Sequence, residues 1–211
     1  MSKTVRTGLF DNILERRSCR YFDSKREVSN WDVMLILEAG RWAPSAKNLQ
    51  PYEFIILRDK RRRKKLAEIA RQPQPRKAPV SIVVLGDLEI AGLAGELSPH
   101  DTTTKWKGEH VFIYMDVAAA IENMLLVAHS LGLGSLWISS FDGRALRNLL
   151  RIPKKFRPLA IIPLGYPARK PTPPPKRRLR DIVHWENFKP SPYDTQLIEF
   201  SKQINVESDP R

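Results

Sequence analysis

The sequence predicts an α+β fold, because helical patterns alternate with at least four strand-like runs of β-branched and apolar residues. The chain has 211 residues, of which 42% are hydrophobic and 28% are charged. That composition is typical of a globular protein, and the length is enough to bury one sizeable core. We therefore expect one domain over residues 1–188, followed by a C-terminal extension over residues 189–211. The tail from Asp181 to Arg211 is too polar to fold alone.

Two helices are expected before the first strand. Residues 9–15 form a short helical pattern that leads into a basic loop. Ser29 and Asp32 then have the spacing of a capping box, and apolar residues follow at helical period until the chain reaches Pro44. A third helix is predicted over the basic residues 60–70. The proline-rich connection that follows, residues 71–79, is not expected to continue that helix.

Four runs have the composition of strands: residues 52–59, 79–87, 132–138 and 157–167. The last run is apolar on both faces, which predicts a central place in the sheet. A short helix is expected between the last two runs. Residues 88–110 have weak periodicity, and they could form short helices or a lid over a site.

The longest apolar stretch, residues 111–131, is expected to be a buried helix rather than a membrane span. Asp116, Glu122, Asn123 and His129 interrupt it, whereas a span is continuous over about 20 residues. Apolar side chains occupy most of the helix circumference, so several sides should be covered. One of those sides can serve as a subunit interface.

The net charge of +13 raises the question of a nucleic acid partner, and residues 60–65 are the densest basic block. No aromatic platform or zinc-finger spacing lies nearby, so the sequence favours a solvated helix face.

Cys19 is the only cysteine, which excludes an intramolecular disulfide and suits a reducing compartment. The first ten residues lack a secretory signal pattern, and we expect a cytoplasmic protein. Cys19 itself is expected to be an inert small residue rather than a reactive thiol.

Several catalytic classes have little support in the sequence. The four histidines lack His-Glu-x-x-His spacing, no Gly-x-Ser-x-Gly or Walker motif is present, and residues 132–135 precede a strand rather than follow one. No metal site is expected. The polar clusters that remain contain no obvious acid, base or nucleophile, which indicates that a bound cofactor carries the chemistry.

Three polar clusters are candidates for binding that cofactor. Guanidinium groups and a hydroxyl are suited to a phosphate, and alternating cations on an extended segment can face one anion. Amide side chains can read the edge of a heterocycle such as flavin. Surface turns and helix caps are the alternative explanations for each cluster taken singly. The clusters are Arg16, Arg17, Ser18 and Arg20; Ser45, Asn48 and Gln50; and Lys176 and Arg178.

Together, in this order and spacing, the clusters resemble the FMN-dependent nitroreductase family. The resemblance covers about residues 9–188. It includes the Arg-Arg-Ser-x-Arg opening, the Pro-Ser-x-x-Asn-x-Gln-Pro loop, the segments APVSIVVLGD and DVAAAIENMLLVAHSLGLGSLWI, the segment IIPLGYP, and the final Lys-x-Arg. This resemblance implies a central, mostly antiparallel sheet flanked by helices, in a homodimer whose domains are entwined and whose extension, residues 189–211, packs on the partner.

The resemblance also assigns roles to the cationic residues. Arg16 and Ser18 would hold the FMN phosphate together with Lys176 and Arg178, while Arg17 helps to frame the site. Arg20 would lie near the N1 and C2 carbonyl edge of the isoalloxazine, where it stabilises negative charge.

The amide loop and the third strand would complete the cofactor site. Pro44, Ser45, Asn48 and Gln50 resemble a loop that reaches the FMN of the other subunit. The strand that backs the ring is expected at Trp137, Ile138, Ser139 and Ser140, and a main-chain N–H of Ser139 or Ser140 would point at flavin N5. Serine stands here where many relatives have glycine or glutamate.

The implied activity is a ping-pong transfer of hydride from NADH or NADPH, through flavin N5, to an acceptor such as a nitroaromatic or a quinone. No side chain need act as acid or base in the first step, because positioning supplies the rate. Trp106, His110 or Tyr114 could contact the second substrate. The alternatives are a flavin-dependent dehalogenase or flavin-cleaving enzyme of the same fold, and a basic nucleic-acid-binding protein.

Overall fold

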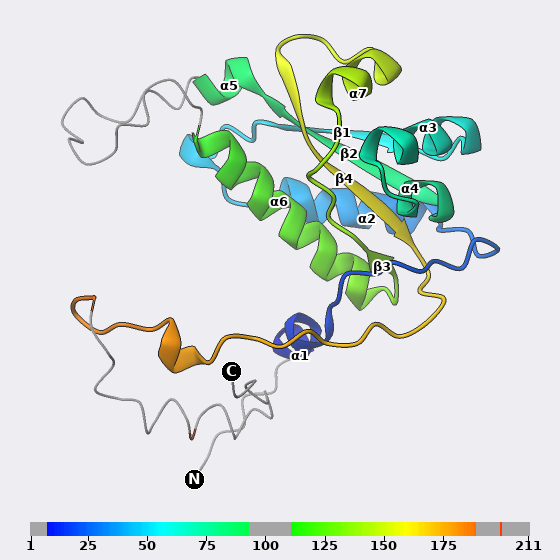
Figure 1. Ribbon diagram of the computed structural model, residues 1–211. Helices are drawn as coiled ribbons and strands as arrows, with labels where there is room; N and C mark the ends of the chain where they lie inside the picture. The colour runs from blue at the N-terminus through cyan, green and yellow to red at the C-terminus, as the bar shows by residue number, and fades with distance from the viewer. Residues whose placement is uncertain (1–7, 93–110, 189–198, 200–211) are drawn as a thin grey trace. The chain divides into compact units, whose positions relative to one another are not determined.

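The structure is a computed structural model that describes residues 8–92, 111–188 and 199 (Figure 1). Contacts within the chain divide it into two units. One unit is continuous, residues 16–171, and contains the sheet. The other combines residues 1–15 with residues 172–211. Each unit is considered separately.

The larger unit is built on a four-stranded sheet with the order β1-β2-β4-β3, in which every pair of neighbours is antiparallel. The strands are β1 (Tyr52–Leu57), β2 (Val80–Asp87), β3 (Gly134–Ser135) and β4 (Phe156–Gly165). All of β2 is buried, and so is the second half of β4. The α+β class and the interior place of β4 are therefore confirmed.

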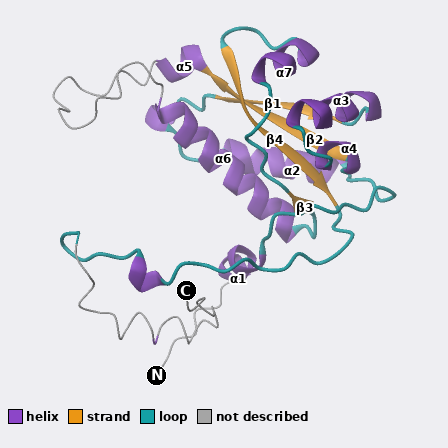
Figure 2. Cartoon of the chain, in the orientation of Figure 1, coloured by secondary structure: helices purple, strands orange, loops and turns teal. Residues whose placement is uncertain are grey.

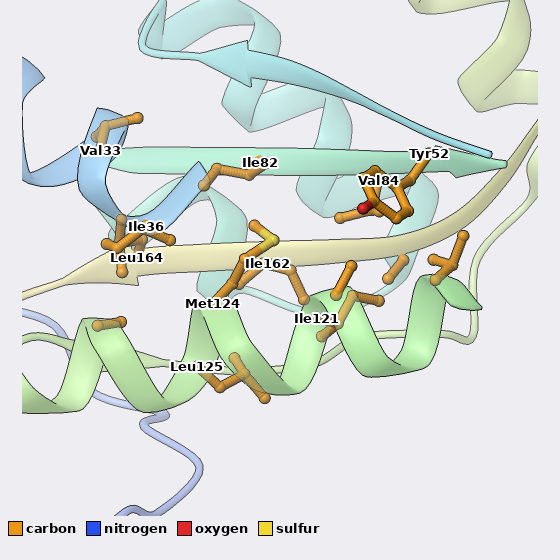
Figure 3. Packing of buried hydrophobic residues seen from close by; sticks show 14 of the residues in the cluster. Val33, Ile36, Tyr52, Ile82, Val84, Ile121, Met124, Leu125, Ile162 and Leu164 are labelled. Carbon is orange, nitrogen blue, oxygen red and sulfur yellow. The ribbon is translucent and has the colours of Figure 1, made fainter. Parts of the chain in front are cut away.

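One face of the sheet packs against α2 (Asn30–Arg41) and α6 (Val111–Ser130). Side chains alternate between the faces of a strand, so Ile82, Ile162 and Leu164 share this side of the sheet. They meet Ile36 of α2 and Met124 of α6 (Figure 3). The predicted cap of α2 is present, because the Ser29 Oγ accepts the Asp32 N–H at 2.9 Å.

The opposite face packs against α3 (Lys60–Ala70) and α7 (Gly143–Leu150), so that helices lie on both sides of the strands (Figure 2). Its core contains the β2 residues that alternate with the first set, including Val83 and Leu85, together with Leu66 of α3 and Leu146 of α7. The bounds of α3 are those that the sequence predicts. Short helices α4 (Gln74–Lys77) and α5 (Leu88–Gly92) and a 3-10 turn at Ala46–Asn48 also belong to this unit.

Helix α6 is long and apolar enough to cross a membrane by length and composition. In the structure it is instead a core helix: Ile113, Ala120, Ile121 and Met124 are almost fully buried against the sheet and α2. Packing within the chain therefore covers one side of α6, while Met115 and Tyr114 remain exposed.

One predicted strand is shorter in the structure, and one predicted connection contains a short helix of its own. The run over residues 132–138 forms a strand only at Gly134–Ser135, with Ile138 in an isolated bridge to Ile161. The Leu136 N–H donates to the Pro163 carbonyl at 3.2 Å, but a proline has no N–H with which to continue the ladder. Residues 71–79 do not continue α3, which ends at Ala70 as predicted, but they contain the separate short helix α4. Its proline stands in the first turn, where no backbone N–H is needed.

The smaller unit contains α1 (Gly8–Glu15), close to the predicted helix, and a 3-10 turn at Leu179–Asp181. Residues 172–178 have no regular secondary structure, as their prolines predicted. The extension predicted over residues 189–211 lies outside the described residues except for residue 199. Residues 93–110 of the predicted lid also lie outside them.

Candidate functional site

The basic segment after α1 is held along the sheet by backbone hydrogen bonds. Ser18 forms a parallel bridge with Ser135, and the Cys19 N–H donates to the Ser135 carbonyl at 2.8 Å. Further on, the Asp23 N–H donates to the Tyr166 carbonyl, and the Tyr21 carbonyl accepts the Ala168 N–H, each at 2.8 Å. The segment therefore extends the sheet beyond β3, and its shape depends on main-chain groups.

Burial separates the core residues of this segment from the candidate site residues, although an ideal strand would alternate its side chains. Strict alternation is broken here, because Cys19 and Phe22 are buried while Arg20 and Tyr21 between them are exposed. Arg20 has no hydrogen-bond or ion-pair partner among the described residues. The Arg16 Nε lies 3.5 Å from Glu122 Oε1 on α6. Arg17 donates to the Arg16 carbonyl at 2.7 Å. The structure thus brings Arg16 and Ser18 to one place beside β3 and α6.

The lone cysteine of this segment is a packing residue. Cys19 lies so close to β3 that a Cβ at Gly134 would stand 2.6 Å from the Cys19 Cβ. Burial raises the pKa of the Cys19 thiol, and a backbone hydrogen bond with Tyr21 opposes this effect only in part. The thiolate is disfavoured, which supports the inert role that the sequence predicts.

The second cluster lies on a tight loop between α2 and β1. Lys47, Asn48 and Gln50 all have φ between 50° and 57°, a left-handed conformation that is unfavourable for residues other than glycine. Local bonds hold them there: the Ser45 Oγ accepts the Gln50 N–H at 3.0 Å, and Gln50 Nε2 lies 3.3 Å from Asn48 Oδ1. Ser45, Asn48 and Gln50 are therefore brought together by bonds among themselves.

One buried carboxylate anchors this loop to α6. The Ala46 N–H donates to both oxygens of Asp116, at 3.2 and 3.1 Å. Burial raises the pKa of Asp116, and the bond from Ala46 opposes this. Sequence reasoning used Asp116 only as an argument against a membrane span and missed this role. The signal was a carboxylate in an apolar helix, which needs a partner when buried.

Both clusters thus attach to the same helix. Asp116 and Glu122 are six residues apart on α6, which separates them by about 9 Å along the helix axis. The loop and the basic segment consequently lie along one element of the larger unit.

The third group of predicted residues follows β3. Ile138 exchanges backbone bonds with Ile161 at 3.0 and 2.9 Å, so its side chain joins the core and those of its neighbours do not. Trp137, Ser139 and Ser140 are exposed. Within the described part of the chain, the N–H groups of Ser139 and Ser140 have no acceptor. Two main-chain donors are therefore available at this edge.

The family model for the nitroreductase family matches residues 13–166. The chain belongs to the nitroreductase family. A Bacillus subtilis FMN reductase [NAD(P)H] is 30% identical over an alignment of 209 residues, which covers 92% of this chain and 83% of that protein. An Archaeoglobus fulgidus protein with the provisional name NADH dehydrogenase/NAD(P)H nitroreductase is 37% identical over 161 residues, 74% of this chain and 83% of that protein.

Solved structures agree with the family assignment. A crystal structure from Parabacteroides distasonis, with the same provisional name as the archaeal protein, has a TM-score of 0.72 and 29% identity. That comparison covers 87% of this chain and 100% of the other. The nitroreductase match includes all three residue groups of the larger unit, and it ends before Lys176 and Arg178.

Lys176 and Arg178 belong to the smaller unit, so the two parts of the predicted phosphate site are described separately. Arg178 is already paired: its Nε and Nη2 donate to the Asp181 carboxylate at 2.8 and 3.1 Å. The bond to Asp181 raises the pKa of Arg178. In a nitroreductase site, Asp181 would therefore orient Arg178 or compete with a phosphate for it.

Of the three residues suggested for the second substrate, only Tyr114 is described. It lies on α6, is 36% exposed, and has the Arg157 guanidinium 5.3 Å from its ring centre. Trp106 and His110 lie outside the described residues. Among the described residues, no group of three or more His, Cys, Asp or Glu side chains could hold a metal ion.

Proposed function

We propose that this chain is a cytoplasmic, NAD(P)H-dependent FMN oxidoreductase that works as a homodimer and reduces nitroaromatics, quinones or similar acceptors. The observation that supports this most is the basic segment beside β3, where backbone bonds fix the positions of Arg16, Ser18 and Arg20. Membership of the nitroreductase family supports FMN as cofactor and NAD(P)H as electron donor.

The donors in the larger unit fit FMN chemically. A phosphate needs cationic and hydroxyl donors, which Arg16 and Ser18 supply, and the ring needs main-chain donors such as the N–H groups of Ser139 and Ser140. When bound, FMN takes a hydride from NAD(P)H and passes the electrons to the acceptor. In the proposed site, Lys176 and Arg178 add to the phosphate contacts and Arg17 frames them.

The protein's contribution would be electrostatic and positional. The exposed Arg20 guanidinium would sit at the N1–C2 edge of the ring, where negative charge gathers on reduction. An N–H from Ser139 or Ser140 would donate to N5 and fix the ring against the segment of Trp137 and Ile138, of which only the Trp137 side chain is exposed. Ser45, Asn48 and Gln50 would reach the ring bound by the other subunit, with Pro44 setting the entry to their loop. Neither acid nor base is needed for hydride transfer.

Exposed apolar side chains support a homodimer. Trp31 is 73% exposed and Met34 is 59% exposed on α2, while Met115 on α6 is 61% exposed. The two helices pack against each other, and large exposed apolar side chains such as these are typical of an interface between proteins. We propose that a second copy covers them, and that residues 189–211 pack on that copy as an extension of the domain formed by residues 1–188.

The absorption spectrum of the purified protein tests the cofactor. We expect the bands of oxidised flavin, and bleaching when NADPH is added without oxygen. Replacing both Arg16 and Arg178 by Ala should release flavin and leave thermal unfolding nearly unchanged. Two exposed cations outside the clusters, Arg151 and Lys154, provide the matched double-Ala control. Folded, colourless protein that takes up no added FMN would contradict the proposal.

Product analysis separates reduction from the other chemistries of the fold. We expect the reduced enzyme to be reoxidised by a nitroaromatic or a quinone at a rate that depends on acceptor concentration. Release of halide from a halogenated substrate, or cleavage of the flavin in the presence of oxygen, would instead support the alternatives named above.

A further inference from the structure

The basic face of α3 and α4 is not used by the proposed oxidoreductase. Six consecutive cations open α3, and burial divides them: Arg63 is buried, while the other five are exposed. Three more exposed cations follow on the turn after α3 and on α4. We define the basic surface as Lys60, Arg61, Arg62, Lys64, Lys65, Arg71, Arg76 and Lys77.

Arg63 shows what a structural cation in this helix does. Its Nη1 donates to the Ala78 carbonyl and, at 3.1 Å, to the Arg76 carbonyl, while its Nε donates to the Arg58 carbonyl at 3.2 Å. These bonds tie α3 to α4 and hold the basic surface rigid. By contrast, no side chain of the basic surface forms an ion pair or a hydrogen bond with any described residue.

The exposed cations oppose the stability of their own helix. Lys60, Arg61 and Arg62 occupy the first turn of α3, at the positive end of the helix dipole, and that turn contains no acidic residue. Lys60 with Lys64 and Arg61 with Lys65 also place like charges four residues apart. Since the fold does not benefit from these charges, a bound anion is the better explanation for them.

The residue types on and around the basic surface indicate which class of anion it can bind. The apolar residues of α3, including Leu66, Ala67 and Ala70, are buried, so no apolar group is left to enter a membrane. Residues 58–79 contain no aromatic side chain on which a base could stack. What remains is an extended set of Lys and Arg donors, which suits closely spaced phosphates.

We infer that the basic surface binds the phosphate backbone of double-stranded nucleic acid without reading its sequence. This inference is independent of the proposed oxidoreductase. Helix α3 packs on the sheet face that carries Val83 and Leu85, whereas Asp116 and Glu122 belong to α6 on the opposite face. A duplex on α3 and α4 would therefore lie across the sheet from α6.

Anisotropy of a short labelled duplex at several salt concentrations tests the inference. The wild-type association constant should fall steeply with salt between about 50 and 200 mM. Changing Arg61, Lys64 and Lys65 together to Gln should weaken binding about tenfold or more and make the logarithmic salt slope shallower by about 3. The matched control changes Arg151, Lys25 and Lys154 to Gln, which removes the same charges from exposed positions elsewhere.

A reverse substitution sharpens the test. Glu68 is the only acidic residue of α3, and it is exposed. Glu68→Lys should therefore tighten duplex binding several-fold and steepen the salt slope. This variant also decides the question if the triple Gln variant fails to fold.

Several results would overturn the inference. Absence of wild-type binding at the lowest salt would do so, and so would equal weakening by the two triple variants, which would make net charge the only cause. Stronger binding to vesicles of phosphatidylglycerol than to the duplex, lost in the basic-surface variant alone, would identify a membrane surface instead.

Discussion

The two segments proposed to contact the cofactor are held in place by different means. The segment from Arg16 to Phe22 is fixed by main-chain bonds to β3 and to the chain just after β4. The loop from Pro44 to Pro51 has three residues in the left-handed region, and its shape depends on side-chain acceptors from Ser45 and Asp116.

This difference indicates what a substitution in each segment would report. Main-chain bonds persist when a side chain changes, so variants of Arg16, Ser18 or Arg20 should alter binding without altering the shape of the segment. In the loop, removal of one acceptor leaves an N–H unpaired and releases a strained backbone. A loss of function in a loop variant would therefore arise from a change in the shape of the loop.

The largest effect on stability is expected at Gly134 of β3, where the Cys19 side chain packs directly against the strand backbone. In Gly134→Ala, the new Cβ would stand 2.6 Å from the Cys19 Cβ, so the basic segment would have to shift. Overpacking of this kind should lower the free energy of unfolding by about 3 kcal/mol, measured by urea denaturation. Gly143→Ala is the matched control, because nothing lies within 4 Å of its Cβ position. Equal stability of the two variants would show that the segment is not held tightly.

The second prediction concerns the anchor of the loop. Asp116→Ala should weaken FMN binding about tenfold, because the Ala46 N–H loses its acceptor. Asp116→Asn keeps an acceptor oxygen and should stay within about threefold of wild type. Fluorescence titration with FMN measures both affinities. Unchanged affinity in Asp116→Ala would mean that the loop does not depend on this bond.

The third prediction compares a serine-to-alanine substitution in the loop with one in the basic segment. Ser45→Ala removes the acceptor of the Gln50 N–H and should lower the free energy of unfolding by about 1 kcal/mol. Ser18→Ala leaves the ladder in place, so its unfolding free energy should differ from wild type by less than about 0.5 kcal/mol. Urea denaturation compares the two. A larger loss for Ser18→Ala than for Ser45→Ala would reverse the comparison.

Local features of the fold could be predicted from the sequence because neighbouring residues determine them. Ser29 and Asp32 cap α2 as their spacing indicates, and α3 begins after Asp59, which accepts the Arg62 N–H at 2.8 Å. That β3 contains only two residues could not be predicted, because its end depends on Pro163 of β4, a strand distant in the sequence.

In the candidate site, too, some features could be predicted from the sequence and others depend on residues distant in the chain. Residue types revealed the donors of the basic segment, but the anchoring role of Asp116 depends on a residue 70 positions earlier in the chain. The pairing of Arg178 with Asp181 is different, because a separation of three residues within a turn could have been recognised. Residue types therefore identified the candidate binding groups, and only the tertiary structure shows what holds them in place.

The smallest expected effect is a pH dependence that arises from the same anchor. Burial raises the pKa of Asp116 above its ordinary value of 3.8, so the folded state keeps that proton to higher pH than the unfolded chain does. The stability that this proton contributes is fully present below the unfolded pKa and is lost as the pH rises through the folded pKa. Relative to Asp116→Asn, wild type should lose unfolding free energy in urea as the pH rises from about 4, and then level off.

Asp87 should give a pH dependence of stability with the opposite sign. Burial acts to raise the pKa of Asp87, but hydrogen bonds from the N–H groups of Ile90 and Glu89 and from the Lys155 ammonium outweigh burial and lower that pKa. Wild type should therefore lose stability relative to Asp87→Asn only on acidification below about pH 4, and slopes of the same sign in both pairs would contradict the assignment.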